Sequence, residues 1–487
     1  MRLTALRFSA LLDRNGLVVM QYVSTRGDAP VLGFSDAMLA GLARDGGLYL
    51  PSEWPEFSTA EIRHMRGLDY PSLVVRLLTP FLSDEISTAD FTRIVHEAYA
   101  TFRHPATCPL IQIGSNHFIL ELFHGPTLAF KDVAMQLLAR LMDHALAERG
   151  QRATIVGATS GDTGGAAIDA FAGRDRTDIF ILFPHGRVSA VQQRQMTTST
   201  APNVHALAIE GNFDDCQALV KDMFNDHAFR DGIRLSGVNS INWARIMAQI
   251  VYYFSSAITL GAPDRPVSFT VPTGNFGDVF AGYAAKRMGL PVERLVIATN
   301  DNDILARTLA TGVYEMRDVI ATSSPSMDIQ ISSNFERLLF ESTGRTAAMV
   351  KRYMAGLKQS GAFTLDPEPV SVIRSQFSAG RSTMNETDAA IRKTLETTGY
   401  LADPHTATAI HVANKNASKE TPMVVLATAH PAKFPDAVEG ACGVRPSLPA
   451  WLGDLMNRPE RFTVLPSGLK MVEDYVSRHA RAVRQGV

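Results

Sequence analysis

Short apolar runs alternate with longer segments of helical periodicity over most of the chain. From about residue 118 the run FILELF is followed by a segment with apolar residues at helical spacing, and then by the run TIVGA. This alternation is typical of parallel strands that are connected by helices, and it predicts an α/β fold. Further strands are expected at 179–183, 204–209, 267–271, 295–299 and 423–427.

Two regions, residues 1 to about 100 and about 325 to 420, lack comparable strands and have a more helical pattern. A chain of 487 residues exceeds what one hydrophobic core usually supports, so several domains are expected. We predict two open α/β domains, with an extra N-terminal domain and a helical insertion. The predicted ranges are 1–100 for the N-terminal domain, 101–260 and 261–487 for the α/β domains, and about 325–420 for the insertion.

Composition narrows the classes of function. The net charge of −2, without a long basic run, gives no electrostatic reason to expect nucleic acid or an acidic membrane as a partner. No apolar run approaches the length of a membrane span, and we expect a cytoplasmic protein. The three cysteines lie far apart without metal-ligand spacing, so no metal site is expected. These features favour chemistry on a small molecule.

Lys131, in the stretch HGPTLAFKD, is the first lysine of the chain, and the next is Lys221. Arginines are scattered through the same region, so the chain has another residue type for exposed positive charge. Only a lysine can lose its proton near neutral pH and condense with an aldehyde. Lys131 is therefore a candidate for a reactive amine.

Two glycine-containing loops follow predicted strands and run into helical segments. Thr159, Ser160, Gly161, Asp162 and Thr163 follow TIVGA. Glycines and hydroxyls at a helix start offer N–H groups to an anion, and ligands of α/β proteins bind at such strand ends. No lysine follows these glycines, which excludes a Walker loop. From the residues alone, this loop is the stronger candidate for a phosphate.

The second loop comprises Gly274, Asn275, Phe276, Gly277 and Asp278 after VSFTV. It can bind an anion in the same way. A tight turn in which Asp278 caps the helix is the alternative.

Two further positions carry side chains suited to a ligand. Thr428 follows the strand MVVLA, where its hydroxyl could meet a ring nitrogen or could simply cap a turn. Asn239, Ser240 and Arg245 open another helical segment and could converge on an anion, since a guanidinium presents a planar fork to phosphate oxygens. A helix cap with a surface arginine is the alternative interpretation.

Taken together, these segments resemble threonine synthase of the longer bacterial and fungal type, among the fold type II pyridoxal phosphate enzymes. The resemblance is carried by HGPTLAFKDVAMQ, GATSGDTGGAA, VNSINWARIMAQ, VPTGNFGD and LATAHPAKFP, and by YVSTRGDAPVLGFSDAMLAGLARDGGLYLP near the N-terminus. It implies a lyase that converts O-phospho-L-homoserine and water to L-threonine and phosphate, with pyridoxal phosphate as cofactor. A monomer or a homodimer is expected.

The resemblance also implies a role for each motif. Lys131 would carry the cofactor and exchange protons with the substrate. The 274–278 loop would hold the cofactor phosphate, and Thr428 would contact the ring nitrogen. The 159–163 loop would face the substrate carboxylate instead, contrary to what the residues alone favour. The residues that would bind the substrate phosphate are Asn239, Ser240 and Arg245.

Two departures from the family pattern and two rival functions stay open. Many fold type II relatives have Asn at the position of Asp162, where a carboxylate would repel the substrate unless it were protonated or turned away. Residues 1–19 precede the expected family start. A phospho-lyase or serine/threonine dehydratase of the same fold is the nearest rival, and a catalytically silent binding protein is another.

Overall fold

The computed structural model describes residues 20–482, so the prediction of an N-terminal extension at residues 1–19 lies outside the described part. Two mostly parallel sheets dominate it, one of six strands and one of five. Two small antiparallel pairs complete the strands: β1 (Tyr22–Ser24) with β2 (Tyr49–Pro51), and β11 (Val313–Glu315) with β12 (Ala362–Thr364). The predicted α/β class is confirmed.

The six-stranded sheet has the order β13-β10-β9-β14-β4-β3. All neighbouring pairs are parallel except β4 with β3. Its strands are β3 (Leu110–Gln112), β4 (His117–Glu121), β9 (Val267–Pro272), β10 (Val292–Thr299), β13 (Phe377–Arg381) and β14 (Met423–Ala427).

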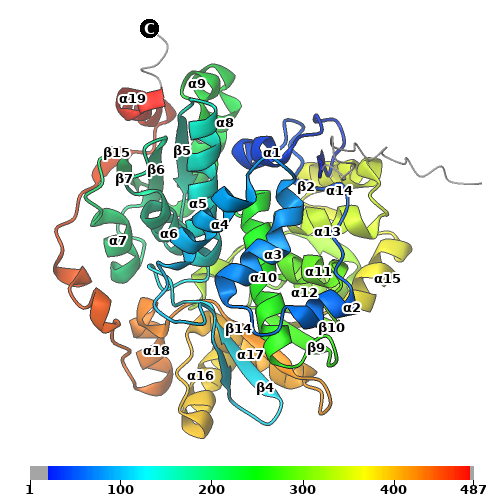
Figure 1. The fold of residues 1–487 in the computed structure, drawn as a ribbon. Helices are drawn as coiled ribbons and strands as arrows, with labels where there is room; N and C mark the ends of the chain where they lie inside the picture. The colour runs from blue at the N-terminus through cyan, green and yellow to red at the C-terminus, as the bar shows by residue number, and fades with distance from the viewer. Residues whose placement is uncertain (1–19, 483–487) are drawn as a thin grey trace, which may run out of the picture.

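The five-stranded sheet has the order β15-β7-β6-β5-β8 and is parallel throughout. Its strands are β5 (Ala153–Ala158), β6 (Thr177–Pro184), β7 (Val204–Glu210), β8 (Leu235–Ser236) and β15 (Thr463–Pro466). Every residue of the central strand β6 is buried, as expected for a strand covered on both faces. Figure 1 shows β5, β6 and β7 on the left, and β4, β9, β10 and β14 toward the lower centre.

Each apolar run that the sequence pattern predicts to be a strand overlaps one of these strands; FILELF extends two residues beyond the end of β4, whereas 423–427 coincides with β14. Membership of the sheets, however, crosses the predicted boundary at residue 260 in both directions. Strands β3 and β4 precede that boundary but pair with the later strands, whereas β15, near the C-terminus, pairs with β7. The alternating pattern predicts strands but does not say which strands pair. The domain ranges themselves stay a prediction.

The region expected to be a mostly helical insertion also contributes a strand to the six-stranded sheet. Strand β13 has the sequence FSAGR and lies at the sheet edge, where its residues are mostly half-buried. Gly380 allows close packing there, because a Cβ atom would lie 2.8 Å from the side chain of Val412. A short edge strand with Ser, Gly and Arg carries no apolar signal, which explains why it is not predicted.

The helices that precede the sheet strands in the chain, or that connect one strand to the next, supply many residues of the large hydrophobic core. The central helix α10 (Trp243–Thr259) packs against α3, α5 and α11. The other helices of this group are α1 (Phe34–Ala40), α2 (Thr59–His64), α3 (Tyr70–Leu82), α4 (Thr88–Tyr99), α5 (Lys131–Glu148), α6 (Asp162–Phe171), α7 (Ala190–Thr197) and α11 (Gly277–Arg287).

The remaining helices make up the rest of the described helical structure. Helix α17 (Pro404–Asn416) packs on β9, β10 and β14, and α8 (Phe213–Asn225) and α19 (Leu469–His479) pack together beside the five-stranded sheet. The others are α9 (His227–Gly232), α12 (Ile304–Thr311), α13 (Phe335–Ser342), α14 (Ala347–Ser360), α15 (Pro367–Gln376), α16 (Met384–Thr398) and α18 (Pro435–Cys442), with short 3₁₀ turns η1 (Pro325–Met327), η2 (Pro431–Lys433), η3 (Ala450–Leu452) and η4 (Leu455–Asn457).

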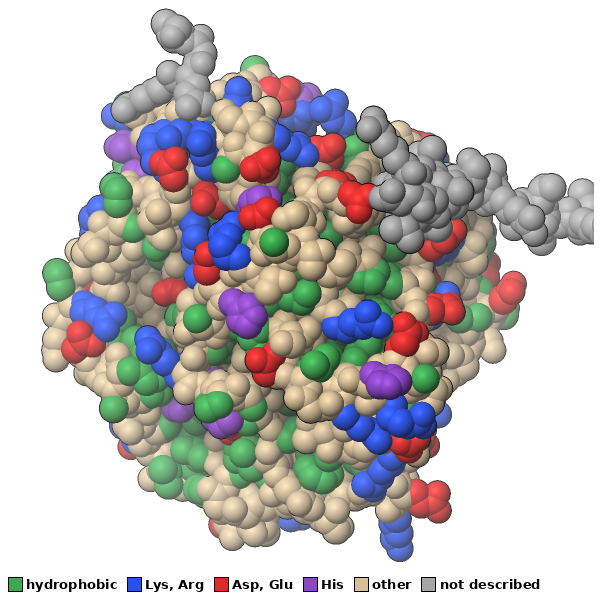
Figure 2. All heavy atoms as spheres, viewed as in Figure 1, with side chains coloured by type: hydrophobic (Ala, Val, Ile, Leu, Met, Phe, Trp, Pro, Cys, Tyr) green, Lys and Arg blue, Asp and Glu red, His purple; other side chains and the backbone are tan. Residues whose placement is uncertain are grey.

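The surface is mixed in charge. Figure 2 shows Lys and Arg interspersed with Asp and Glu over the described part of the face drawn, without one dominant sign. Within residues 20–482, no helix has the length and apolar character that crossing a membrane requires.

Candidate active site

One cavity of about 750 Å³ opens where the carboxyl ends of β5, β9 and β14 meet. Loops that leave these strand ends are the usual ligand-binding positions of α/β sheets. The cavity is lined by every predicted site residue except Gly161, namely Lys131, Thr159, Ser160, Asp162, Thr163, Asn239, Ser240, Arg245, Gly274, Asn275, Phe276, Gly277, Asp278 and Thr428. Residues far apart in the sequence are thus brought to one site.

Lys131 is the first residue of α5 and is 8% exposed. Its Nζ donates to Oδ2 of Asp162 at 3.3 Å. Burial lowers the pKa of Lys131; the charge of Asp162 opposes this shift, and the positive charges of Lys433 and Arg245 add to it. A lowered pKa increases the fraction of neutral amine, which is the nucleophilic form.

The 274–278 loop ends at an uncapped helix. Phe276 has a φ of 63°, in the left-handed region, and α11 begins at Gly277 without a side-chain cap. The first N–H groups of such a helix have no partner within the helix and favour an anion. Burial raises the pKa of Asp278 to about 6, and its Oδ1 accepts from the hydroxyls of Tyr252 and Tyr253 rather than from the helix N–H groups. The geometry fits a phosphate better than the predicted alternative, in which Asp278 caps the helix.

Hydrogen bonds within the chain already use N–H groups in and directly after the 159–163 loop. The Thr159 hydroxyl oxygen accepts hydrogen bonds from the N–H groups of Gly161 and Gly164, both at 2.9 Å. Gly161 has a φ of 142° and lies against Gln192, where a Cβ atom would be 2.3 Å from the amide carbon. The glycines therefore serve a tight turn, and the loop has fewer free donors than its sequence suggests.

Asp162 is buried and surrounded by donors. Its Oδ1 accepts from Nε2 of Gln192 at 2.9 Å and lies 3.0 Å from Nζ of Lys433, and Ser326 donates to Oδ2 at 3.2 Å. Burial alone would raise the pKa of Asp162, but the nearby charges of Lys433 and Lys131 hold it well below its usual range. The carboxyl group is therefore ionised, and its charge is balanced by lysines rather than removed by protonation.

Arg245 is 2% exposed and has no carboxylate partner within hydrogen-bonding distance among the described residues. Its Nη1 donates to the carbonyl oxygen of Val238 at 3.1 Å, whereas its buried Nε has no acceptor in the described part of the chain. Burial lowers its pKa to about 10. A buried guanidinium that lacks an anionic partner fits an anionic ligand, and the alternative of a surface arginine is wrong.

The neighbouring Asn239 and Ser240 lie in the loop before α10 rather than at its start. The helix begins at Trp243, and Asn242 is its N-cap, accepting from the N–H of Ala244 at 3.0 Å. Asn239 is exposed and Ser240 half-buried, and both line the cavity.

Thr428 directly follows β14 and is 6% exposed. Its carbonyl oxygen accepts from the N–H of Phe130 at 2.9 Å, which places the residue beside the helix start that carries Lys131. Thr428 also lines the cavity.

Two residues that the sequence pattern did not indicate connect the loop of Asn275 to the loop of Ser240. Asn334 donates through Nδ2 to the carbonyl oxygens of Asn275, at 2.9 Å, and Ser240, at 3.2 Å. Arg337 is fully buried and donates to Asn334 Oδ1, to Ile241 O and to a carbonyl in the N-terminal region. Both come from the region predicted as an insertion, whose helical pattern gives no sign of a site.

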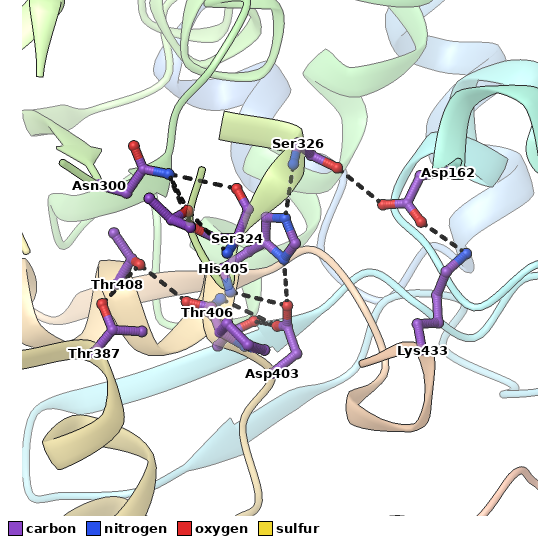
Figure 3. Close-up of polar contacts among 12 residues, drawn as sticks. Asp162, Asn300, Ser324, Ser326, Thr387, Asp403, His405, Thr406, Thr408 and Lys433 are labelled. Atoms are coloured by element: carbon purple, nitrogen blue, oxygen red, sulfur yellow. Dashed lines mark hydrogen bonds and ion pairs between the residues drawn. The ribbon is translucent and has the colours of Figure 1, made fainter. Parts of the chain in front are cut away.

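A second set of unpredicted residues closes the cavity on the side of α17 (Figure 3). The N–H of Ser326 donates to Nε2 of His405 at 3.3 Å, and Nδ1 of His405 lies 2.7 Å from Oδ2 of Asp403. Ser326 thereby joins Asp162 on one side to His405 on the other. Lys433 is fully buried below Asp162, although the sequence pattern suggested only a residue of a polar loop.

The residues fit pyridoxal phosphate. The buried amine of Lys131 suits its aldehyde, the uncapped start of α11 suits its phosphate, and Thr428 can meet its ring nitrogen without adding charge. In the described part of the chain, no group of three or more His, Cys, Asp or Glu side chains could hold a metal ion.

Fold and site together define a pyridoxal-phosphate-dependent enzyme. The family model "Pyridoxal-phosphate dependent enzyme" matches residues 108–429. Models for the threonine synthase N terminus and C-terminal region match residues 21–99 and 406–476. The chain belongs to the threonine synthase family.

Relatives across the whole length support this assignment. A threonine synthase of Pseudomonas aeruginosa is 53% identical over 462 residues, covering 94% of this chain and 98% of the relative. The crystal structure of a threonine synthase from Brucella melitensis with bound pyridoxal phosphate has a TM-score of 0.93 and 71% identity, covering 95% of this chain and 100% of that one. A yeast threonine synthase structure has a TM-score of 0.90 and 38% identity, with coverages of 94% and 98%. The predicted family and fold type II class are confirmed.

Proposed function

We propose that this enzyme converts O-phospho-L-homoserine and water to L-threonine and phosphate. Arg245 is the observation that carries the choice of substrate. It is a buried guanidinium with an unpaired Nε, and it lines the same cavity as the amine of Lys131. A substrate with a phosphate supplies the anion that this guanidinium lacks, and the Asn239 and Ser240 side chains can donate to the remaining oxygens.

The chain has a group for each charged part of the reactants. Lys131 would bind the aldehyde carbon of pyridoxal phosphate through Nζ, while the start of α11 holds the cofactor phosphate. The 159–163 loop would bind the substrate carboxylate through Ser160, Thr163 and its backbone. Thr428 would accept or donate one hydrogen bond at the ring nitrogen.

When bound, the cofactor supplies an electron sink that acidifies the carbon–hydrogen bonds of an amino-acid substrate. Lys131 Nζ would take the Cα proton and then a Cβ proton, and its lowered pKa brings this exchange closer to neutral pH. The bond between Cγ and the phosphate oxygen would break, and the two protons taken by Lys131 would return to Cγ and to Cα. The oxygen of water would add at Cβ, and the proton that water loses would balance the charge of the released phosphate. Arg245 would hold the phosphate throughout, so that homoserine without a phosphate loses this contact.

A product assay tests this proposal against its rivals. Purified protein supplied with pyridoxal phosphate and O-phospho-L-homoserine should release phosphate and threonine in equal amounts. Phosphate with 2-oxobutyrate in place of threonine would indicate a phospho-lyase. If L-serine or L-threonine formed 2-oxo acids faster than O-phospho-L-homoserine is turned over, the protein would be a dehydratase. If no substrate were turned over, the protein would be a binding protein.

Location and assembly stay predictions. We expect a cytoplasmic enzyme that is a monomer or a homodimer. Cell fractionation and analytical ultracentrifugation test these two expectations.

A further inference from the structure

The side chain of Lys433 is fully buried, yet all its hydrogen-bonding capacity is used. Its Nζ donates to Thr127 O at 2.7 Å and to Gln195 Oε1 at 3.0 Å, and it lies 3.0 Å from Asp162 Oδ1. An ammonium group has three donors, whereas a neutral amine has two. Three acceptors around one buried nitrogen therefore fit the charged form.

Asp162 is surrounded in the opposite way, by donors only. Gln192 and Lys433 approach Oδ1, whereas Ser326 and Lys131 approach Oδ2. A protonated carboxylic acid would have to place its own hydrogen toward one of these donors. Four groups that can donate, one of them the ammonium of Lys433, favour a carboxylate, in agreement with the lowered pKa of Asp162. Figure 3 shows Lys433 and Ser326 on opposite sides of this carboxylate.

The charges of this group balance only when Lys131 is neutral. Asp162 and Lys433 cancel each other, so the amine of Lys131 can lose its proton without leaving an unpaired carboxylate in the interior. If Lys433 were absent, Lys131 would be the only lysine beside Asp162. A buried carboxylate without another cation would then hold Lys131 in its protonated, unreactive form.

We propose that Lys433 is a positioning residue that neutralises Asp162 and so frees the amine of Lys131 for reaction. The inference rests on the proposed role of Lys131. It also explains how a carboxylate can stand in the loop proposed to bind the substrate carboxylate, because the paired lysine offsets its charge.

The direction of the effect follows from the charged and titratable groups around the amine. Those facing Lys131 or its carboxylate partner are Asp162, Lys433, Arg245, Asp278 and His405, and Asp132 is the next residue along α5. Removing Lys433 takes away a positive charge that lowers the pKa of Lys131. It also leaves Lys131 as the only lysine beside the carboxylate of Asp162. Both changes raise the pKa of Lys131.

The experiment measures how fast the full-length chain, freed of cofactor, captures added pyridoxal phosphate between pH 6 and 10. The visible absorbance of the bound cofactor is the signal. In Lys433→Met the pH midpoint of the capture rate should rise by about one unit or more relative to wild type. Lys415→Met is the matched control, since Lys415 forms a 3.4 Å ion pair with Glu386 on an exposed site and should leave the midpoint unchanged.

A double variant separates neutralisation from packing. Asp162→Asn/Lys433→Met removes both charges and keeps similar side-chain volumes, so its midpoint should return to the wild-type value or fall below it. An unshifted midpoint in Lys433→Met would overturn the inference, as would a double variant that stays as shifted as the single one. If Lys433→Met does not fold but the double variant folds and captures cofactor, neutralisation is supported. If neither folds, Lys433 is needed for packing and the inference is wrong.

Failure of this inference is distinguishable from failure of the proposed function. Capture of the cofactor does not require turnover of a phosphorylated substrate. A wild-type chain that captures no cofactor would contradict the role proposed for Lys131. Normal capture with an unshifted midpoint in Lys433→Met would contradict only the role of Lys433.

Discussion

At the scale of single residues, the chemistry depends on which basic side chain, lysine or arginine, occupies each position of the cavity. Lys131 and Arg245 are both buried in one cavity, yet they suit different tasks. The amine can lose a proton and form a bond to carbon, whereas the guanidinium keeps its charge and presents a planar fork. Exchanging one type for the other should therefore abolish activity at Lys131 and impair substrate binding at Arg245.

Lys131→Arg should abolish threonine formation as completely as Lys131→Ala. An arginine keeps the positive charge but can neither bond to the cofactor nor exchange protons near neutral pH. Borohydride treatment followed by peptide mapping should find the cofactor on Lys131 in the wild type and on no peptide of either variant. An adduct on Lys221 or Lys433, or measurable turnover by Lys131→Arg, would contradict the assignment.

Arg245→Ala should lower kcat/KM for O-phospho-L-homoserine, because the substrate phosphate would lose a charged bidentate partner. The decrease should correspond to a loss of about 2 kcal/mol or more of transition-state stabilisation. Arg245→Lys should recover only part of the loss, since an ammonium is a point donor. The bound cofactor should keep its absorbance in both variants. Unchanged kinetics in a folded Arg245→Ala would remove this residue from the substrate site.

The sequence pattern indicates those residues that combine unusual chemistry with a strand end or a glycine loop, such as Lys131 and Gly274. It does not indicate Lys433 or Asn334. Lys433 is two residues beyond a proline in a polar loop, and its burial depends on β14 lying beside the start of α5. Asn334 precedes a helix in the insertion, and its contacts form only when that helix packs against two distant loops. Roles of this kind are set by tertiary contacts.

At the scale of elements, the uncapped start of α11 is held against η1. Gly274 is essential to this approach, because a Cβ atom there would lie 2.7 Å from the carbonyl oxygen of Ser326. The carbonyl of Gly274 also accepts from the Ser332 hydroxyl at 2.6 Å. The loop is thus fixed from both sides. Even a small substitution at Gly274 should therefore alter the position of any group bound at the helix start.

Gly274→Ala should weaken the affinity for pyridoxal phosphate about tenfold, because overpacking of this size costs roughly 1–3 kcal/mol. Equilibrium titration of the cofactor absorbance measures the effect. Gly232→Ala is the control, since an added Cβ there meets nothing within 4 Å. Equal affinity of both variants would show that the 274–278 loop does not hold the cofactor.

Elements with a strong period are predicted well and irregular ones are not. The apolar run of β6 and the helical stripe of α5 determine their own structure, and both are found as expected. Strand β13 is short, polar and at an edge, so only pairing with β10 identifies it. The start of α10 also differs, because Asn242 rather than an earlier polar residue caps the helix.

At the scale of the molecule, several hydrogen bonds join the N-terminal region to the insertion, and a buried carboxylate forms three of them. Glu336 on α13 is 6% exposed and accepts from the Thr25 hydroxyl at 2.6 Å. Arg26 donates to both of its oxygens, at 3.0 and 2.9 Å. The two regions are predicted as separate parts of the chain, but this contact connects them directly.

Glu336→Ala should lower the free energy of unfolding by about 2–3 kcal/mol, because the buried Thr25 and the half-buried Arg26 lose their acceptor. Urea denaturation followed by circular dichroism measures the change. Glu97→Ala removes an exposed carboxylate from its 3.0 Å pair with Arg93 and should cost less than about 1 kcal/mol. Similar losses of unfolding free energy in the two variants would show that the contact of Glu336 with Thr25 and Arg26 contributes little to stability.

The pairing of β15 with β7 has a consequence for synthesis on the ribosome. Strands β5, β6, β7 and β8 leave the ribosome early, but β15, which covers the outer edge of β7, begins only at Thr463. Until then the nascent sheet has an open edge, and such edges pair readily with other chains. A nonsense mutation shortly before Thr463 would spare every residue of the cavity and should still yield aggregates, which a chaperone that shields the edge of β7 would reduce.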